Sequence, residues 1–347
     1  MIIAAKASDT VYVYRILIFN WRSSRKKVYT RLMLNRGDGE IYSQCHIKNT
    51  YLYMSPESYT KNMSLIVTIV DNMGMHICAD LRIVQPETRP KNKERHIPNF
   101  FNGVLKIVPV SKSLAIAYAG AVSIGLEAIR EVKKSGDLSS DIPGRLIQIL
   151  EDKADTSQCD FIVFDAAEHV IYRIKNGEIT ELRNGRTWIG DVDAYALFQK
   201  ELEKSGFDEG LNVFAKGSMM MNALEAVINE NSIENVGEYP LAMLTHDGEI
   251  QPVVSFKAQG PTQLRPGLNP ITFSNNPNVD SLIINTLVPV ERGVAAIGLY
   301  LNKFQKGALY LPLERDEPFI VDGKTIEEFR KKVESEHGVE LLGGGFE

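Results

Sequence analysis

The alternation of hydrophobic and polar residues becomes regular from Ser64 onward. The next six residues, LIVTIV, form a nearly continuous β-branched run, as expected for a strand that is covered on both faces. DNMG then supplies turn residues, and MHICADLRIV predicts a second strand. The polar, proline-containing residues 87–103 predict a loop, after which VLKIVPVSKSLAIAYAG predicts another pair of short strands.

The hydrophobic period changes to that of a helix after Gly120. AVSIGLEAIREVKK places Val122, Leu126 and Ile129 on one face, and SSDIPGRLIQILEDKA predicts a second helix with Ser or Asp near its cap. CDFIVFDAAEHVIYRIKNGEITEL predicts a hairpin around KNGE. Two more helices are expected near DAYALFQKELEKSG and KGSMMMNALEAVINEN, and another hairpin in YPLAMLTHDGEIQPVVSFKA. This order predicts sheets that lie between helical layers, rather than a parallel doubly wound sheet.

The first 62 residues differ in charge from the rest of the chain. They carry 10 Lys and Arg against 4 Asp and Glu, whereas residues 63–347 carry 29 against 40. After TVYVYRILIFNW they show no sustained period of either a strand or a helix. Three interpretations stay open for residues 1–63: translated sequence upstream of a true start at Met63, which we favour, then a basic propeptide, or a small accessory hairpin.

Residues 256–347 are expected to form a C-terminal extension. SLIINTLVPVERGVAAIGLYL and GALYLPLE predict additional strands, and TIEEFRKKVESEHG predicts an amphipathic helix that stops at a glycine. The last residues, LLGGGFE, are expected to be a mobile tail. We expect the extension to pack on the preceding domain or on a neighbouring subunit.

The composition is that of a chain with a substantial core, because 44% of its 347 residues are hydrophobic and 24% are charged. A net charge of -5 gives no global reason to expect nucleic acid or an anionic membrane as the main partner. No run of about 18 apolar residues predicts a transmembrane helix, and Arg15 interrupts the apolar stretch that a signal peptide needs. The unpatterned cysteines Cys45, Cys78 and Cys159 fit a reducing compartment, so we expect a cytoplasmic protein.

The six histidines form no metal motif. They are never spaced at i and i+4, and no HExxH, Walker lysine loop or strand-linked GxGxxG is present, so we expect neither a metal nor a cofactor. His76 lies between Met75 and Ile77 in a predicted strand and is interpreted as a residue of the core or of a face edge. The methionines at 219–221 are interpreted as helix packing rather than as a metal site.

Short motifs follow one another at fixed spacing after residue 63. Ser64 begins the first predicted strand, Gly74 lies in the turn, and the second strand carries ADLR, in which Asp80 is sixteen residues after Ser64. This order resembles the proteasome β-subunit-like group of N-terminal nucleophile (Ntn) hydrolases, which includes bacterial ring peptidases. In that group the mature chain starts with Thr or Ser on a strand.

Two further positions extend the resemblance. Lys106 stands at the start of a strand and Gly120 ends the next one, at the mutual separation found in the group. The loop between Arg82 and Lys106 is longer than usual. The similarity covers roughly residues 64–255 and implies an α+β fold, the four-layer αββα sandwich of the group.

The resemblance implies a role for each matched residue. Ser64 would be the nucleophile, and its α-amine, whose ordinary pKa of about 8 suits neutral pH, would be the general base. Lys106 would lie beside the serine oxygen and lower the cost of ionisation, while Asp80 would pair with Lys106 and keep it charged. The Gly120 amide would donate to the developing oxyanion.

Supporting positions depart from the pattern of the group. TWIGDVDAY resembles the segment that carries a GSG-type serine near the nucleophile, but Asp191 stands where that serine is expected. Asp191 is therefore a candidate contact of the α-amine or a sign of an altered site. NVGEY resembles the later glycine turn, without the usual nearby Asp-x-x-Ser.

The favoured hypothesis is a peptidase that acts on peptides or unfolded proteins through an acyl-enzyme on Ser64. The resemblance implies a homo-oligomeric ring and makes an ATPase a candidate partner, with neither nucleic acid nor membrane as a partner. An Ntn amidase acting on a small non-peptide amide is a second enzymatic hypothesis, because a fold does not determine a substrate. The third is a non-catalytic ring-forming subunit, which Asp191 and the long preceding segment favour.

Overall fold

The computed structural model describes most of the chain between residues 64 and 343. The positions outside the description there are 82–102, 139–140, 154–158, 209, 231, 234–235, 238, 253–255 and 260–281; only strand backbone is described before residue 64, at 256–259 and at 282–283. By its internal contacts the chain divides into two units, Met1–Ser58 and Tyr59–Glu347.

The first unit contains an antiparallel sheet in the order β1-β2-β3-β4. The strands are β1 (Ile2–Ala4), β2 (Val11–Phe19), β3 (Lys26–Asn35) and β4 (Ile41–His46). Strands β3 and β4 lie in the stretch whose sequence shows no sustained period of a strand or a helix. The ladder hydrogen bonds of a sheet are made by the backbone, so the pairing of β3 with β2 and of β4 with β3 does not require clean alternation of side chains.

The first sheet of the second unit has the order β12-β5-β6-β13-β14, with every pair antiparallel. Helices α3 (Val192–Lys204) and α4 (Val213–Asn229) pack against it, and their buried residues share one core cluster with residues of β5, β6 and β13. The helix α4 begins before the predicted segment because the Asn212 side chain accepts a hydrogen bond from the Ala215 amide at 2.9 Å. The strands are β5 (Leu65–Asp71), β6 (Gly74–Asp80), β12 (Gly185–Gly190), β13 (Pro240–His246) and β14 (Glu249–Pro252).

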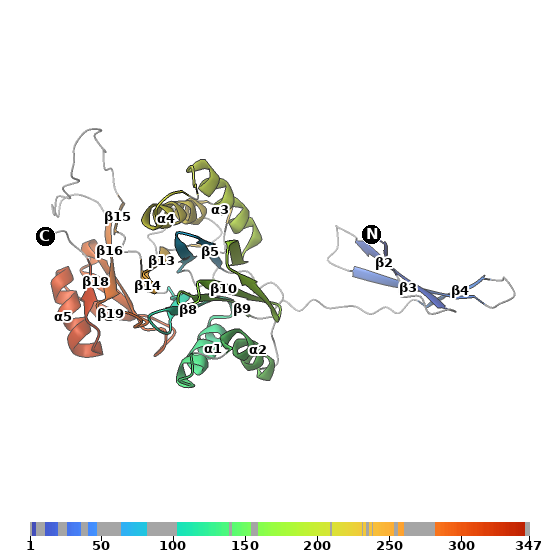
Figure 1. The fold of residues 1–347 in the computed structure, drawn as a ribbon, viewed down its shortest axis with the longest axis horizontal. Helices are drawn as coiled ribbons and strands as arrows, with labels where there is room; N and C mark the ends of the chain where they lie inside the picture. The colour runs from blue at the N-terminus through green and yellow to red at the C-terminus, as the bar shows by residue number, and fades with distance from the viewer. Residues whose placement is uncertain are drawn as a thin grey trace. The chain divides into compact units, whose positions relative to one another are not determined.

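The second sheet has the order β11-β10-β9-β8-β7 and is also antiparallel. Helices α1 (Val122–Lys134) and α2 (Ile142–Asp152) pack against it (Figure 1). As predicted, an acidic residue caps α2: the Asp141 carboxylate accepts a hydrogen bond from the Gly144 amide at 2.9 Å. The strands are β7 (Ile107–Pro109), β8 (Leu114–Gly120), β9 (Cys159–Asp165), β10 (Val170–Lys175) and β11 (Glu178–Leu182).

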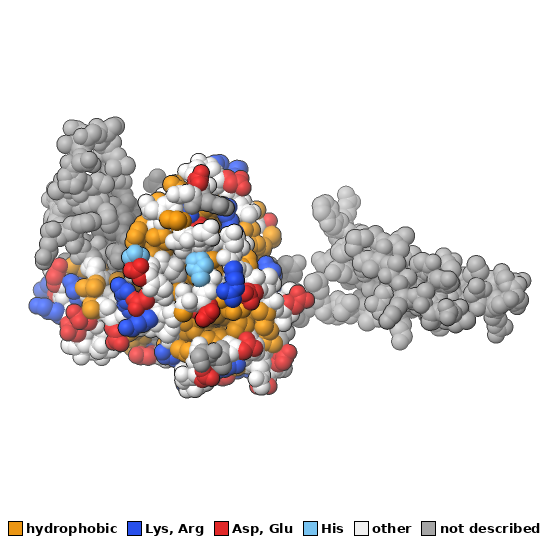
Figure 2. Space-filling view, in the orientation of Figure 1, with side chains coloured by type: hydrophobic (Ala, Val, Ile, Leu, Met, Phe, Trp, Pro, Cys, Tyr) orange, Lys and Arg blue, Asp and Glu red, His pale blue; other side chains and the backbone are white. Residues whose placement is uncertain are grey.

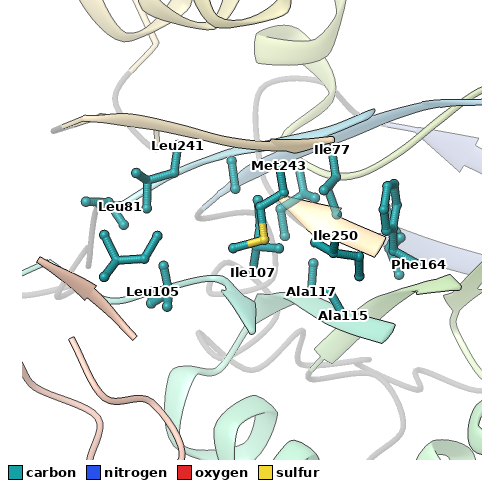
Figure 3. Close-up of a cluster of buried hydrophobic side chains, with 14 of the residues drawn as sticks. Ile77, Leu81, Leu105, Ile107, Ala115, Ala117, Phe164, Leu241, Met243 and Ile250 are labelled. Carbon is teal, nitrogen blue, oxygen red and sulfur yellow. The ribbon is translucent and has the colours of Figure 1, made fainter. Parts of the chain in front are cut away.

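A separate core cluster joins the first two sheets of the second unit. Figure 3 shows Ile77 of β6 and Met243 of β13 on one side, and Ala117 of β8 and Phe164 of β9 on the other. Cys78, the neighbour of Ile77, belongs instead to the cluster that faces α3 and α4. The strand β6 is therefore covered on both faces, which explains its continuous apolar sequence. The antiparallel pairing confirms that the chain is not a doubly wound parallel sheet.

The C-terminal segment adds a third antiparallel sheet in the order β15-β16-β17-β18-β19. Its buried residues Ile284, Leu299 and Tyr310 belong to the same core cluster as the inner faces of the first two sheets, so the extension packs on the preceding domain within one chain. The strands are β15 (Phe256–Gln259), β16 (Leu282–Pro289), β17 (Ile297–Leu301), β18 (Lys306–Tyr310) and β19 (Phe319–Asp322).

The predicted C-terminal helix is confirmed as α5 (Ile326–His337). It ends at Gly338, whose φ of 67° is the left-handed conformation that favours glycine. The expectation of a mobile tail is wrong for its first residues, because Leu341–Leu342 form strand β20 against β16 and Leu341 is buried. Packing of Leu341 into the cluster beneath α5 explains why this part of the tail forms a strand. Residues 344–347 lie outside the described residues.

The described surface carries charges of both signs. Figure 2 shows acidic and basic side chains interspersed over the visible face, with hydrophobic side chains in patches between them. Within the described part of the chain, none of the helices has the length and apolar character that a membrane crossing requires.

Candidate active site

Ser64 directly precedes strand β5 and is buried, with 3% of its surface exposed. Its carbonyl oxygen accepts a hydrogen bond from the Asp191 amide at 2.8 Å. In the 347-residue chain its nitrogen is joined to Met63 in a peptide bond. An amide nitrogen does not accept a proton as an amine does, so Ser64 has its own base only if it becomes the amino terminus.

Asp80, at the end of β6, is fully buried and lies next to the residue that follows Ser64. Its Oδ1 accepts a hydrogen bond from the Leu65 amide at 3.0 Å. Its Oδ2 accepts one from Lys106 Nζ at 2.8 Å and one from the Gly237 amide at 3.2 Å. The carboxylate thus links the start of β5, the segment before β7 and the loop before β13.

Lys106 is buried with Asp80, so the two charges form an ion pair away from water. Such a pair gains little net stability over an apolar pair, but removal of one partner costs about 3–5 kcal/mol because the other charge is left buried. The pair also joins the two sheets, since Asp80 ends β6 and Lys106 precedes β7. The resemblance implies that Asp80 pairs with Lys106, and the two side chains do form this ion pair.

Gly120 ends β8, at the same end of the second sheet at which Lys106 precedes β7. The Tyr118 amide donates to the Lys106 carbonyl oxygen at 3.1 Å, and Gly120 is two residues further along the strand. Its φ of 124° lies in the region that favours glycine. Helix α1 begins directly after it, with Ala121 at the N-cap and no side chain capping the first turn.

Asp191 is the N-cap of α3. Its Oδ1 accepts hydrogen bonds from the Asp193 and Ala194 amides, both at 2.9 Å, in addition to the bond that its own amide makes to Ser64. Aspartate is a favoured N-cap because its carboxylate satisfies the free amides of the first turn. From the sequence, Asp191 was a candidate contact of the α-amine or a sign of an altered site. Its role as the cap of α3 was not predicted.

Two glycines beside the predicted residues were missed as parts of the site. A Cβ at Gly190 would collide with the Ser64 carbonyl oxygen, and the φ of Gly190 is 103°, so this position requires glycine. Gly237 supplies an amide to Asp80. Gly190 stands in TWIGDVDAY, the segment compared with a GSG-type serine segment, and Gly237 stands in NVGEY, the segment compared with a glycine turn; those two comparisons were the available signal. Arg82, the last residue of ADLR, lies outside the described residues.

A second buried aspartate–lysine pair lies at the other end of the β5–β6 hairpin. Lys216 Nζ of α4 donates to Asp71 Oδ2 at 2.6 Å, and Lys216 is fully buried. His169 Nε2 lies 2.9 Å from the Asp71 carbonyl oxygen. Burial alone would raise the pKa of Asp71, but hydrogen bonds from Lys216 and from the Met73 amide outweigh it and lower that pKa. This pair was not predicted from the sequence.

His76 lies near the second pair and is 1% exposed, which confirms its interpretation as a core residue. Neither ring nitrogen has a hydrogen-bond partner among the described residues. Burial lowers the pKa of His76 from 6.5 to about 4; the Asp71 charge opposes this shift and the Lys216 charge adds to it. His76 is therefore neutral at pH 7.

We expect His76 to make the folded chain less stable in mild acid. Between pH 6.5 and about 4, His76 binds a proton more readily in the unfolded chain than in the folded one. The contribution of His76 to the free energy of unfolding therefore falls as the pH falls through this window and is nearly constant above it. From pH 7 to pH 5 the expected loss is about 2 kcal/mol. Urea unfolding of the unmodified chain and of His76→Leu measures it. His246→Gln, at an exposed histidine, should keep the slope of the unmodified chain; the same slope in His76→Leu contradicts the assignment.

The other nucleophile and metal candidates in the described residues are weak. Cys78 and Cys159 are free and buried, and burial raises the pKa of both thiols, which disfavours a thiolate. The side chain of Cys45 lies outside the described residues. Within the described residues, no three His, Cys, Asp or Glu side chains converge as a metal site. Met220 and Met221 are buried in the core between α4 and β5, which confirms their packing role.

Comparisons with known proteins leave the identity of the chain open. No family model matches the sequence, and no curated protein matches it. A solved structure with a distant likeness of fold is eukaryotic HslV from Trypanosoma brucei, which is 11% identical with a TM-score of 0.39; the match covers 52% of this chain and 98% of that chain. A likeness of this level leaves function to be argued from the chain's own residues.

Proposed function

We propose that the chain is an Ntn hydrolase of proteasome-like fold that cleaves peptide bonds through Ser64. The observation that carries the proposal is the Asp80 carboxylate, which binds the amide next to Ser64 and the buried Lys106 ammonium at the same time. A charged lysine held at the start of the nucleophile strand is what an N-terminal hydroxyl needs, because the positive charge favours the ionised oxygen. The two sheets with their helix pairs are proposed to be the four layers of the αββα sandwich.

The proposed reaction has two steps. The α-amine of a terminal Ser64 takes the proton of its hydroxyl, and Oγ attacks the carbonyl carbon of the peptide. The Gly120 amide stabilises the oxyanion, the leaving amine takes the proton, and an ester forms on Ser64. Water then attacks the ester with the same amine as base, which releases the acid and restores Ser64. Asp80 and Lys106 stay paired and charged during both steps.

The same proposal includes the environment of the reaction. We propose a cytoplasmic homo-oligomeric ring that limits access to the site, with peptides or unfolded proteins as substrates and an ATPase as a candidate partner. Ser64 becomes the terminus when translation starts at Met63 and the methionine is removed, or when residues 1–63 are cleaved as a propeptide. The same nucleophile would also serve an amidase acting on a small non-peptide amide.

Three features of Ser64 and Asp191 favour a non-catalytic ring subunit as the second candidate function. Ser64 is buried and joined to Met63 in the full chain, and its neighbour Asp191 serves as a helix cap. A chain that keeps this peptide bond has the fold and the ion pair without the base. Under this alternative Asp80 and Lys106 are structural residues that join two sheets.

The direct test is peptide hydrolysis by a purified chain that begins at Ser64. We expect turnover of a fluorogenic peptide library to co-elute with a multimer in gel filtration with light scattering, because the proposed site lies inside a ring. The Ser64→Ala chain is the matched control and should assemble without turnover, since only the hydroxyl is removed. Turnover that is equal in Ser64→Ala, or that stays with a monomer, contradicts the proposal.

A further inference from the structure

The loop between α4 and β13 reaches the buried carboxylate of the candidate site. The Gly237 amide donates to Asp80 Oδ2, which also accepts from Lys106 Nζ, while the Leu65 amide donates to the other oxygen. Val236 and Gly237 are buried, so this contact lies away from water. The proposed reaction uses Asp80 and Lys106 but gives Gly237 no role.

The helix before this loop is fixed on the same hairpin. Near its start, Lys216 binds Asp71, which ends β5, and along its length Met220, Leu224 and Val227 share a core cluster with β5 and β6. The loop after α4 then binds Asp80, which ends β6. Asp71 thus binds the start of α4 at one end of the hairpin, and Asp80 binds the loop after α4 at the other end.

A carboxylate needs such donors because its terminal torsion is broad and does not by itself fix the direction of the two oxygens. Hydrogen bonds to a charged group contribute more to stability than hydrogen bonds between neutral groups. With Lys106 and Gly237 on Oδ2, Oδ1 stays directed at the Leu65 amide, one residue from Ser64.

We propose that the Gly237 amide is a positioning group for Asp80, and through it for Lys106 and the start of β5. The inference rests on the proposed function for its catalytic consequence. The positioning itself is a property of the folded chain. The donor is a backbone N–H, so any residue except proline keeps it.

The test compares chains that differ in this one donor. Gly237→Pro removes the N–H, Gly237→Ala keeps it, and an ester in place of the Val236–Gly237 amide removes it without a ring. In the full 347-residue chain, hydrogen exchange of the Leu65 amide should accelerate about tenfold or more in the proline and ester chains and stay unchanged in Gly237→Ala. The Met75 amide, which donates to Thr245 Oγ1 at 2.9 Å at the far end of the hairpin, should keep its protection in all of them.

Turnover provides the second readout, with the chain as its native host processes it. Gly237→Pro should lower kcat about tenfold or more with KM within about twofold, and Gly237→Ala should match the unmodified chain. Equal Leu65 exchange in all chains overturns the inference, and so does acceleration at Leu65 and Met75 alike. The predicted exchange pattern without turnover in any chain supports the positioning and contradicts the proposed function.

Discussion

Replacement of Lys106 by methionine should lower kcat for peptide hydrolysis by about 10²–10³-fold, the loss typical of removing one preorganised charge-stabilising group. Lys106 is the buried cation bound to Asp80, and Asp80 binds the amide next to Ser64. Methionine fills the volume of the stem without the charge. Steady-state kinetics of a chain that begins at Ser64 measure the effect.

Stability must be separated from catalysis in this experiment. Lys106→Met removes the cation that is bound to the buried Asp80 carboxylate, which should cost about 3–5 kcal/mol of unfolding free energy. The double variant Lys106→Met/Asp80→Asn removes both charges, so it should recover most of this loss while turnover stays lost. Lys153→Met is the control, because Lys153 is partly exposed, forms ion pairs with Glu127 and Glu131 and should change turnover little. Turnover near that of the unmodified chain in the double variant contradicts the catalytic role of the pair.

The sequence predicted those parts of the fold whose signals are local. The strands around Gly74, the hairpin at Asn176–Gly177 and helix α2 after Asp141 follow from turn and cap residues and from the hydrophobic period. The pairing of Asp80 with Lys106 was predicted from the resemblance, which supplied a contact that the period of the chain does not contain.

The contacts that were missed join residues far apart in the chain. Gly237 reaches Asp80 across 157 residues and Lys216 reaches Asp71 across 145, and neither pair has a spacing that a periodic pattern reveals. From the sequence Lys216 is expected to be a surface lysine, because an isolated lysine is rarely buried, and its ion pair with Asp71 at the hairpin tip is a long-range contact. The helix cap at Asp191 could have been predicted from the sequence, since an aspartate directly before a helical segment is a common cap.

The second large effect concerns the segment before Ser64. A chain that begins at Met1 and keeps the Met63–Ser64 peptide bond should show turnover about 10²–10⁴-fold below that of a chain that begins at Ser64, because the amide cannot act as the general base. A chain with one extra glycine before Ser64 is the matched control: it lacks the first 63 residues but also lacks the free amine, so it should be as inactive as the full chain. Equal turnover in the three chains would show that the amine of Ser64 has no role.

The most direct measurement of the central claim is the amino terminus of the protein in its native host. Intact mass and amino-terminal peptide analysis should show a chain that begins at Ser64, and a β-lactone probe should label that residue, because only a terminal Ser64 combines the hydroxyl with its base. A mature chain that begins at Met1 and is not labelled at Ser64 contradicts the hydrolase and favours the non-catalytic subunit.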